Sequence, residues 1–458
     1  MAEPLITDWP WRVWATRSPF AVALKAGGIS WCWRDLRHRI DSLAAGFIQQ
    51  GVREASGVVL RSKNTPDALL CYLALLQAGA RLLPLNPQLP QTLCDELLPQ
   101  LNIDFMVDLT GAPLTLPFPE LSLHHAFSES AADWQPERIA TLTLTSGSSG
   151  LPKAAAHSVA AHLASAEGVL GLIPFTLADS WLLSLPLFHV SGQGIIWRWL
   201  TAGASLVVAD GQSFDDALAE CTHASLVPTQ LWRLLQQPVL PASLKDVLLG
   251  GAHIPQEMTE HAERMGIRCW CGYGMTEAAS TVTAKRADGS PGVGQALTGK
   301  AVRLVKNEVQ IRSRSLAAGY WKSGQLTPLP GAEGWFSTRD RGMWQGDELH
   351  IVGRLDNLFF SAGEGIQPED IERVLQSHPQ VERVFVLPLD DAEFGQRPVA
   401  LVDSHPDVTF EHLADWLQGK LARFQQPVRY YVLPQEVAQG GIKISRQQLK
   451  LWLEKQPV

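Results

Sequence analysis

The chain has 458 residues, of which 46% are hydrophobic and 18% charged, so it is long enough for two or three globular domains. Its 38 basic and 46 acidic residues give a formal net charge of −8, which argues against a general nucleic-acid-binding surface. No apolar run approaches the ~18 residues of a membrane span, and the first residues lack a signal-peptide pattern. The six scattered cysteines fit buried reduced thiols better than disulfides or a zinc site, so we expect a cytoplasmic protein.

Helical and strand-like segments alternate along most of the chain, which predicts an α/β fold with a largely parallel sheet. Residues 36–47 carry apolar side chains at helical intervals, and Gly51 closes that run. Short buried strands are expected at 58–60 and 82–84, on either side of an apolar helix at 68–78. This order is that of a β-α-β unit.

A strand expected at 141–145 leads into a loop of small hydroxylated residues and glycines that ends in Lys153. Such a loop suits phosphate, because glycines let the backbone approach a ligand, N–H groups and hydroxyls donate hydrogen bonds, and lysine adds charge. Its spacing is not that of a Walker A loop, and a flexible linker is the weaker alternative because the loop follows a strand. The residues are Thr145, Ser146, Gly147, Ser148, Ser149, Gly150, Leu151, Pro152 and Lys153.

The pattern changes near Asp356. The following ~100 residues have their own order of elements, including a strand at 381–388 and a helix around 413–421, and a segment of that size can hold its own core. We therefore predict a large N-terminal domain of α/β sheets over residues 1–355 and a small C-terminal α+β domain over residues 356–458.

Five motifs in chain order resemble the core motifs of the acyl-adenylate-forming superfamily, which includes acyl- and aryl-CoA synthetases, firefly luciferase and the adenylation domains of peptide synthetases. Each motif alone is weak, but together they are specific, and the resemblance spans essentially the whole chain. The motifs are the 145–153 loop, Tyr273-Gly274-Met275-Thr276-Glu277, Ser337-Thr338-Arg339-Asp340, Gly353-Arg354-Leu355-Asp356, and Lys443 near the end.

The resemblance implies that a carboxylate attacks the α-phosphate of ATP, which gives an acyl-adenylate and pyrophosphate, before coenzyme A accepts the acyl group. Two anions must meet in the first step, so cations and preorganised donors are the main requirement. The loop would hold the departing phosphates, with Thr145 also catalytic, and Glu277 would hold Mg²⁺. Further implied ATP contacts are Gly250, Gly251, Ala252, Gly272, Tyr273, Gly274, Thr276, Asp340 and Arg354. Taken singly, Glu277 could instead be a surface glutamate and Asp340 a solvated turn.

Lys443 is the residue that the resemblance brings to the substrate carboxylate and α-phosphate. Ile442 stands where a glycine is usual, and Lys450 is a competing candidate. Asp356 matches the hinge about which a mobile small domain swings after adenylation, with a plain linker aspartate as the alternative. The loop that then faces the thiol includes Ser361, Gly363 and Gly365, with Ala362 where a second glycine is usual.

Other stretches resemble the branch of the superfamily that joins 2-succinylbenzoate to coenzyme A in menaquinone biosynthesis. They are residues 184–194, 197–199, 356–360 and 422–429. Arg198, between two tryptophans, is the candidate anchor for the ring carboxylate, with a surface arginine as the alternative. Ser225 is a weaker candidate for the acid pocket. His189 matches a gate residue that moves between the half-reactions and is counted among the catalytic residues, with a packed core histidine as the alternative.

The predicted activity is therefore ATP-dependent ligation of 2-succinylbenzoate to coenzyme A. The alternatives are another acyl- or aryl-CoA ligase, an adenylation enzyme that loads a carrier protein, and a non-catalytic nucleotide-binding protein on the same scaffold. Retention of Glu277, Asp340, Arg354 and Lys443 argues against the last. We expect small-molecule substrates, no nucleic acid and no membrane insertion, and leave a homo-oligomer open.

Overall fold

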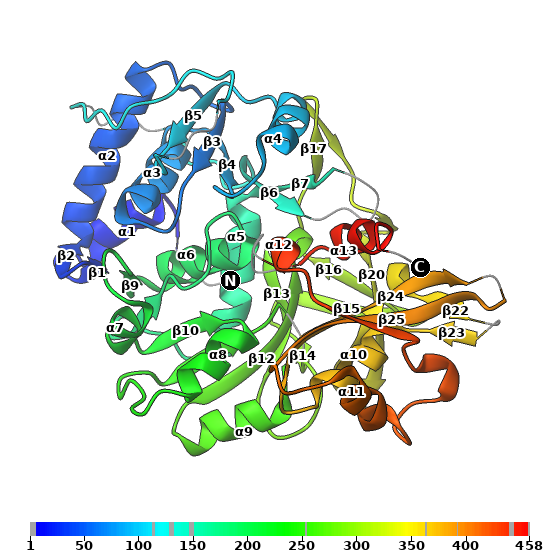
Figure 1. Ribbon diagram of the computed structural model, residues 1–458. Coiled ribbons are helices and arrows are strands. Elements are labelled where there is room, and N and C mark those ends of the chain that lie inside the picture. Colours follow the sequence, from blue (N-terminus) through cyan, green and yellow to red (C-terminus); the bar gives the residue numbers. More distant parts are fainter. Residues whose placement is uncertain are drawn as a thin grey trace. The chain divides into compact units, whose positions relative to one another are not determined.

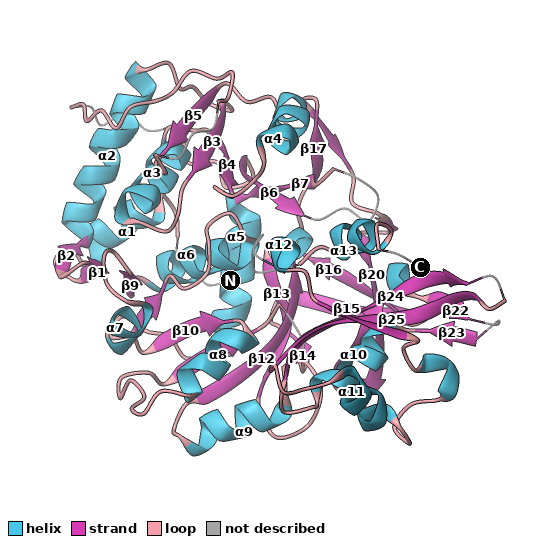
Figure 2. Ribbon diagram, in the orientation of Figure 1, coloured by secondary structure: helices cyan, strands magenta, loops and turns pink. Residues whose placement is uncertain are grey.

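The computed structural model of the chain forms two compact units. One unit comprises Met1–Val302 and Ile311–Phe336, and the other comprises Arg303–Gln310 and Ser337–Val458. Figures 1 and 2 show the elements of both units. The structure describes residues 6–111, 115–127, 132–145, 151–251, 254–361, 364–391, 393–438 and 444–456. Asp356 lies inside the second unit, and a functional boundary at this residue stays a prediction.

Two β-sheets frame the first unit. The strands of the nine-stranded sheet are β1 (Val22–Ala26), β2 (Ile29–Cys32), β8 (Ser180–Leu182), β9 (Ser205–Val208), β10 (His223–Leu226), β11 (Asp246–Leu249), β12 (Arg268–Met275), β13 (Ser280–Arg286) and β14 (Gln295–Ala296). Their order is β14-β13-β12-β11-β10-β8-β9-β1-β2, parallel from β12 to β1 and antiparallel at both edges. The predicted parallel sheet is thus confirmed at its centre.

The second sheet of this unit has seven strands. They are β3 (Gly57–Arg61), β4 (Arg81–Leu85), β5 (Phe105–Asp108), β6 (Ile139–Thr145), β7 (Lys153–Ser158), β17 (Gly319–Lys322) and β18 (Gln325–Thr327). Strands β6, β4, β3 and β5 are parallel, whereas β7, β17 and β18 continue the sheet antiparallel. The strands predicted at 58–60, 82–84 and 141–145 are all confirmed in this sheet.

The main core of the first unit combines helices with both sheets. The helices are α1 (Pro10–Arg17), α2 (Trp33–Gln49), α3 (Pro66–Gln77), α4 (Gln91–Leu97), α5 (Val159–Leu170), α6 (Val190–Ala202), α7 (Phe214–Ala219), α8 (Pro228–Leu235) and α9 (Gln256–Arg264). Side chains of α2, α3, α5 and α6 share one buried cluster with both sheets. The predicted helices at 36–47 and 68–78 are confirmed as α2 and α3, and α3 is apolar all round because it is buried all round.

The second unit holds a smaller sheet with helices on both faces. The elements of this unit include β21 (Glu348–Arg354), β22 (Phe359–Ser361), β23 (Glu364–Ile366), α10 (Pro368–Gln376), β24 (Val381–Asp391), β25 (Gly395–Ser404), α11 (Phe410–Leu417), β26 (Arg429–Val432), α12 (Gln435–Ala438) and α13 (Arg446–Leu453). The smaller sheet is formed by β22, β23, β24, β25 and β26. Alternate residues of β25 pack with α10 and α11 on one face and with α13 on the other. Strands β15 (Lys300–Val305), β16 (Glu308–Ser313), β19 (Gly331–Ala332) and β20 (Trp335–Gln345) lie near or across the division in the chain.

The helix predicted around 413–421 is displaced in the structure. It begins at Phe410, because the Thr409 side chain accepts a hydrogen bond from the N–H of His412 and caps the first turn. It ends at Leu417, shortly before Gly419 takes a positive φ of 74°.

All six cysteines are free thiols, and all except Cys32 are buried. Throughout the described ranges, each helix is too short or too polar to cross a lipid bilayer.

Candidate active site

The two ends of the predicted phosphate loop lie side by side. Strands β6 and β7 pair antiparallel, and Thr145 on β6 is opposite Lys153 on β7. This register holds a threonine hydroxyl and a lysine at the base of the loop. The loop residues Ser146, Gly147, Ser148, Ser149 and Gly150 lie outside the described residues.

Lys153 and Glu277 are joined by a tyrosine that the sequence analysis missed. The Lys153 Nζ lies 4.9 Å from the ring centroid of Tyr320, close enough for a cation–π contact. The Tyr320 hydroxyl donates a hydrogen bond of 2.8 Å to Oε1 of Glu277. Tyr320 reaches both because β17 pairs antiparallel with β7, with Tyr320 opposite Ala155. An aromatic residue in a short strand gave no signal of this role.

The segment that carries Glu277 is also fixed to β7. Thr276 and Glu277 form a 3₁₀ turn, η2 (Thr276–Ala278), directly after β12. The carbonyl of Thr276 lies 2.8 Å from Nε2 of His157, a fully buried residue of β7. Burial lowers the pKa of His157 to about 4, so at neutral pH the ring is uncharged and donates Nε2–H to the carbonyl. Strand β7 therefore positions both Lys153 and the turn of Glu277.

Glu277 suits magnesium better than a transition metal. Among the described residues, no three His, Cys, Asp or Glu side chains gather as a metal site. Mg²⁺ does not need such a cage, because it keeps several waters and binds through one or two carboxylates together with substrate phosphates. A single carboxylate oriented by Tyr320, whose ring also contacts Lys153, fits that requirement.

The predicted nucleotide-binding segments contain glycines at positions where the structure leaves little room for a side chain. Gly250 follows β11, and a Cβ on it would lie 3.3 Å from the carbonyl oxygen of Gly272 on the parallel neighbour β12. A Cβ on Gly274 would lie 2.1 Å from the carbonyl oxygen of Ser280, which excludes any side chain there. Gly251 has a positive φ of 84°, which favours glycine. Ala252 lies outside the described residues, and the contact of Tyr273 with ATP stays a prediction.

Arg198 is a buried cation on α6. It is 2% exposed, which excludes the alternative of a surface arginine. Its Nη2 donates a hydrogen bond of 3.1 Å to Oγ of Ser225, and its guanidinium lies 4.6 Å from the ring centroid of Trp181. Burial lowers the pKa of Arg198 to about 9, which leaves it charged at neutral pH. Within the described part of the chain no carboxylate pairs with it, and its Nε has no hydrogen-bond partner there, so this buried cation could accept an anionic ligand.

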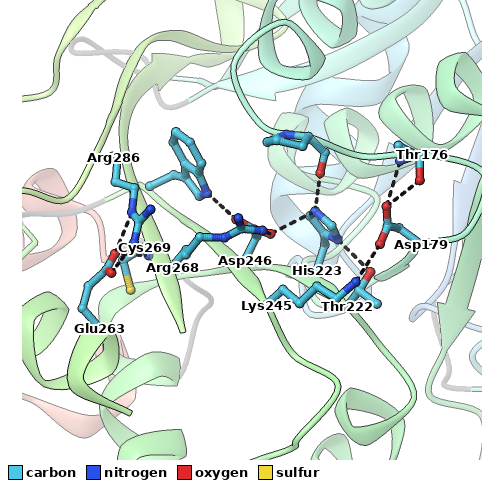
Figure 3. Close-up of polar contacts among 12 residues, drawn as sticks. Thr176, Asp179, Thr222, His223, Lys245, Asp246, Glu263, Arg268, Cys269 and Arg286 are labelled. Carbon is cyan, nitrogen blue, oxygen red and sulfur yellow. Dashed lines mark hydrogen bonds and ion pairs between the residues drawn. The ribbon is translucent and has the colours of Figure 1, made fainter. Parts of the chain in front are cut away.

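A polar network links the strand of Ser225 to its neighbours, and Figure 3 shows its residues His223, Asp246 and Arg268. His223 lies two residues before Ser225 on β10, and its Nε2 is 3.4 Å from Oδ2 of Asp246 on β11. Asp246 also accepts hydrogen bonds from Arg268 and from the indole N–H of Trp270 on β12, the latter at 2.8 Å. Three parallel strands are thereby held together next to the serine that contacts Arg198.

His189 lies on the same helix as Arg198. It is the N-terminal cap residue of α6, is half-buried, and has its ring 4.7 Å from that of Phe188. Its predicted gating role stays a prediction, but α6 carries that residue at its first turn and the predicted acid anchor farther along.

The second unit brings together Asp340, Arg354 and Asp356. Asp340 on β20 is opposite Arg354 on β21 and 7% exposed, which excludes a solvated turn. The two Nη atoms of Arg354 lie 3.2 Å from Oδ1 of Asp340 and 3.0 Å from Oδ2 of Asp356. Burial alone would raise the pKa of Asp356, but hydrogen bonds from Arg339 and Arg354 outweigh it and lower this pKa. Asp340, a predicted ATP contact, and Asp356, the predicted hinge, thus share one arginine.

The predicted thiol-side loop joins β22 to β23. Ser361 on β22 is buried, and Gly365 on β23 is opposite the exposed Phe360. Gly363 and Ala362 lie outside the described residues, and the role of this turn stays a prediction.

Lys443 also lies outside the described residues, but the chain just beyond it is anchored. Arg446 begins α13 and pairs with Glu372 on α10. Its Nη1 donates a hydrogen bond of 2.8 Å to the carbonyl of Val386 on β24. The segment after Lys443 is therefore attached to the core of the second unit.

The chain matches the family model of the AMP-binding enzyme over residues 11–321, and that of the AMP-binding enzyme C-terminal domain over residues 370–439. It belongs to the AMP-binding enzyme family. It is 58% identical to the 2-succinylbenzoate–CoA ligase of Escherichia coli (strain K12), over 99% of this chain and 100% of that protein. It is 56% identical to the ligase of the same name from Salmonella typhimurium, over 98% of each. Its structure matches that of an E. coli MenE variant with bound OSB-AMS, at a TM-score of 0.92 and 56% identity over 98% of this chain and 99% of that chain.

Proposed function

We propose that this chain joins 2-succinylbenzoate to coenzyme A, as a step of menaquinone biosynthesis. In the first half-reaction the succinyl carboxylate attacks the α-phosphate of ATP, which forms the acyl-adenylate and releases pyrophosphate. In the second, the thiol of coenzyme A attacks the acyl carbon and AMP leaves. The observation that carries this choice of acid is Arg198, a buried cation that no carboxylate of the described chain neutralises.

The acid has two carboxylates, and the site must distinguish them. Arg198 can hold the ring carboxylate through charge-assisted hydrogen bonds, directly or through a water, while Ser225 and the Trp181 ring keep the guanidinium in place. The succinyl carboxylate is then left to react. An acid without the second carboxylate would leave Arg198 buried and unpaired, which disfavours its binding.

Thr145, the loop and Lys153 are proposed to hold the phosphates that leave as pyrophosphate. Glu277, oriented by Tyr320, would hold Mg²⁺, which when bound neutralises phosphate charge. Asp340 is proposed to accept hydrogen bonds from the ribose hydroxyls, with Arg354 orienting its carboxylate. Lys443 is proposed to bridge the attacking carboxylate and the α-phosphate in this step.

The second half-reaction needs a different set of residues. We propose that the small domain turns about Asp356, so that the loop of Ser361, Gly363 and Gly365 replaces Lys443 and guides the thiol. His189 would gate the path between thiol and adenylate. A cytoplasmic location is part of the proposal, and oligomerisation is left open.

The test is pyrophosphate release over a panel of aromatic and aliphatic acids, with coenzyme A present, for the native chain and Arg198→Ala. We expect 2-succinylbenzoate to be preferred over benzoate. Removal of charged hydrogen bonds of about 1.5–3 kcal/mol should raise the KM for 2-succinylbenzoate about 10- to 100-fold and that for ATP little. Arg264→Ala, at an exposed arginine on α9, is the matched control. Equal use of benzoate by the native chain would contradict the proposed acid.

A further inference from the structure

The segment between β8 and α6, residues 183–189, ends in His189, and the amide side chain of Asn64 binds it at three points. Nδ2 of Asn64 donates hydrogen bonds to the carbonyls of Leu183 (3.1 Å) and Leu185 (2.8 Å). Oδ1 of Asn64 accepts a hydrogen bond of 3.2 Å from the N–H of Leu187. One amide therefore fixes three alternate backbone groups. Asparagine suits this position because its side chain offers two donors and an acceptor at one short reach.

Asn64 is itself rigidly placed. It lies in the short connection between β3 and α3, and both ends of that connection are anchored. Arg61, the last residue of β3, forms a partly buried ion pair of 2.7 Å with Asp108 on β5. Thr65 caps α3 by accepting a hydrogen bond from the N–H of Ala68. Since β3 belongs to the seven-stranded sheet and β8 to the nine-stranded sheet, Asn64 links the two sheets of the first unit.

Residues 183–189 pack directly against the first turn of α6. A Cβ on Gly192 would lie 2.1 Å from the carbonyl oxygen of Pro186, so backbone meets backbone there. On its other side the segment is bound by Gln193, which is fully buried and donates to a segment carbonyl and to Oγ1 of Thr143, both at 3.1 Å. A shift of the segment would therefore shift the start of α6, where His189 is the cap residue.

We propose that Asn64 is a positioning residue for His189. By fixing the backbone of residues 183–187, it sets the place at which His189 enters α6 and so its position in the reaction. The inference rests on the proposed gating role of His189. It adds a residue from the β3–α3 connection, which none of the predicted motifs includes.

A double-mutant cycle tests the proposal. Adenylation is followed by pyrophosphate exchange, and thioester formation is followed from supplied acyl-adenylate and coenzyme A, for Asn64→Ala, His189→Ala and the double variant. We expect Asn64→Ala to slow the same half-reaction as His189→Ala, by about tenfold, and to have little further effect in the His189→Ala background. Asn64→Asp, which keeps only the acceptor, should slow that half-reaction in the same direction and serves if Asn64→Ala does not fold.

Gln50→Ala is the matched control, because Gln50 is also an amide that holds a distant segment, donating to the carbonyl of Ser122 and accepting from its N–H. It should leave both half-reactions unchanged. Multiplicative effects of Asn64→Ala and His189→Ala, or an equal loss in Gln50→Ala, would overturn the proposal and leave Asn64 a purely structural residue. The outcome is separate from the choice of acid, since a native chain that prefers another acid can be taken through the same cycle with that acid.

Discussion

Residues of the candidate site fix each other's positions through direct side-chain contacts. Tyr320 is the clearest example. Its ring faces the Lys153 ammonium at 4.9 Å, and its hydroxyl donates to Glu277 at 2.8 Å. Without it, the lysine proposed to hold phosphates and the carboxylate proposed to hold Mg²⁺ would attract each other. The tyrosine satisfies both and keeps each in its own place.

Tyr320→Phe removes the hydroxyl and keeps the ring. The Glu277 carboxylate then loses a hydrogen bond of about 0.5–1.5 kcal/mol that orients it, so the Mg²⁺ concentration for half-maximal adenylation should rise about 2- to 10-fold. The rate at saturating Mg²⁺ should change little. The measurement is adenylation rate against Mg²⁺ concentration at fixed ATP. Tyr430→Phe, in the second unit, is the control, and a native Mg²⁺ curve for Tyr320→Phe would exclude the orienting role.

The candidate site residues that can be found from the sequence are those that stand within a short sequence motif. Glu277, Asp340 and Arg354 each stand in a short motif, so the motif identifies them without any structure. Tyr320 and Asn64 have no such context. Their partners lie 43 and 119 or more residues away in the chain, and only the pairing of strands and the meeting of two sheets brings them together.

At the scale of elements, β7 and α5 bury two neighbouring histidines. The rings of His157 on β7 and His162 on α5 lie 5.2 Å apart, and His162 stacks on Trp197 of α6 at 5.1 Å. Burial lowers the pKa of His157 to about 4, and burial together with the neighbouring His157 lowers that of His162 well below its ordinary value. Both rings are therefore uncharged in the folded chain at neutral pH.

Those lowered pKa values make stability depend on pH. The unfolded chain takes up protons near pH 6.5, whereas folded His157 does so only near pH 4. The stabilisation is thus fully present above pH 6.5 and is lost as the pH falls toward 4, by about 3 kcal/mol for His157. The thermal unfolding midpoint should fall between pH 7.5 and 5, and less steeply in His157→Gln. His405→Gln, at an exposed histidine, should keep the native slope, and an unchanged slope in His157→Gln would refute the assignment.

The elements themselves could mostly be predicted, since burial patterns are local. The buried run of α3 and the strands on either side of it follow from apolar residues alone. The bounds of α11 could not be predicted, because they depend on the Thr409 cap and on the turn before Gly419. The antiparallel edges of both sheets also escaped prediction, because they depend on which distant strands meet.

At the scale of the whole molecule, the order of the motifs is more informative than any one of them. The phosphate loop alone indicates a nucleotide, and Glu277 adds a predicted metal ligand. Only a lysine near the end of the chain makes the set one for joining an acid to ATP. Lys443 lies outside the described residues, and the chain from Arg446 onward is attached to Glu372 and Val386 of the second unit.

Lys443→Ala should therefore separate the two half-reactions. Removing a cation that stabilises charge at the α-phosphate should slow adenylation by about 10²–10³-fold, because a preorganised charge is lost from the transition state. Thioester formation from supplied acyl-adenylate should stay close to native, because the proposed role of Lys443 ends once the adenylate has formed. Lys450→Ala, at the competing lysine on α13, is the matched control and should leave both rates unchanged. Equal loss of both half-reactions in Lys443→Ala, or loss of adenylation in Lys450→Ala, would mean that the reacting cation is another residue.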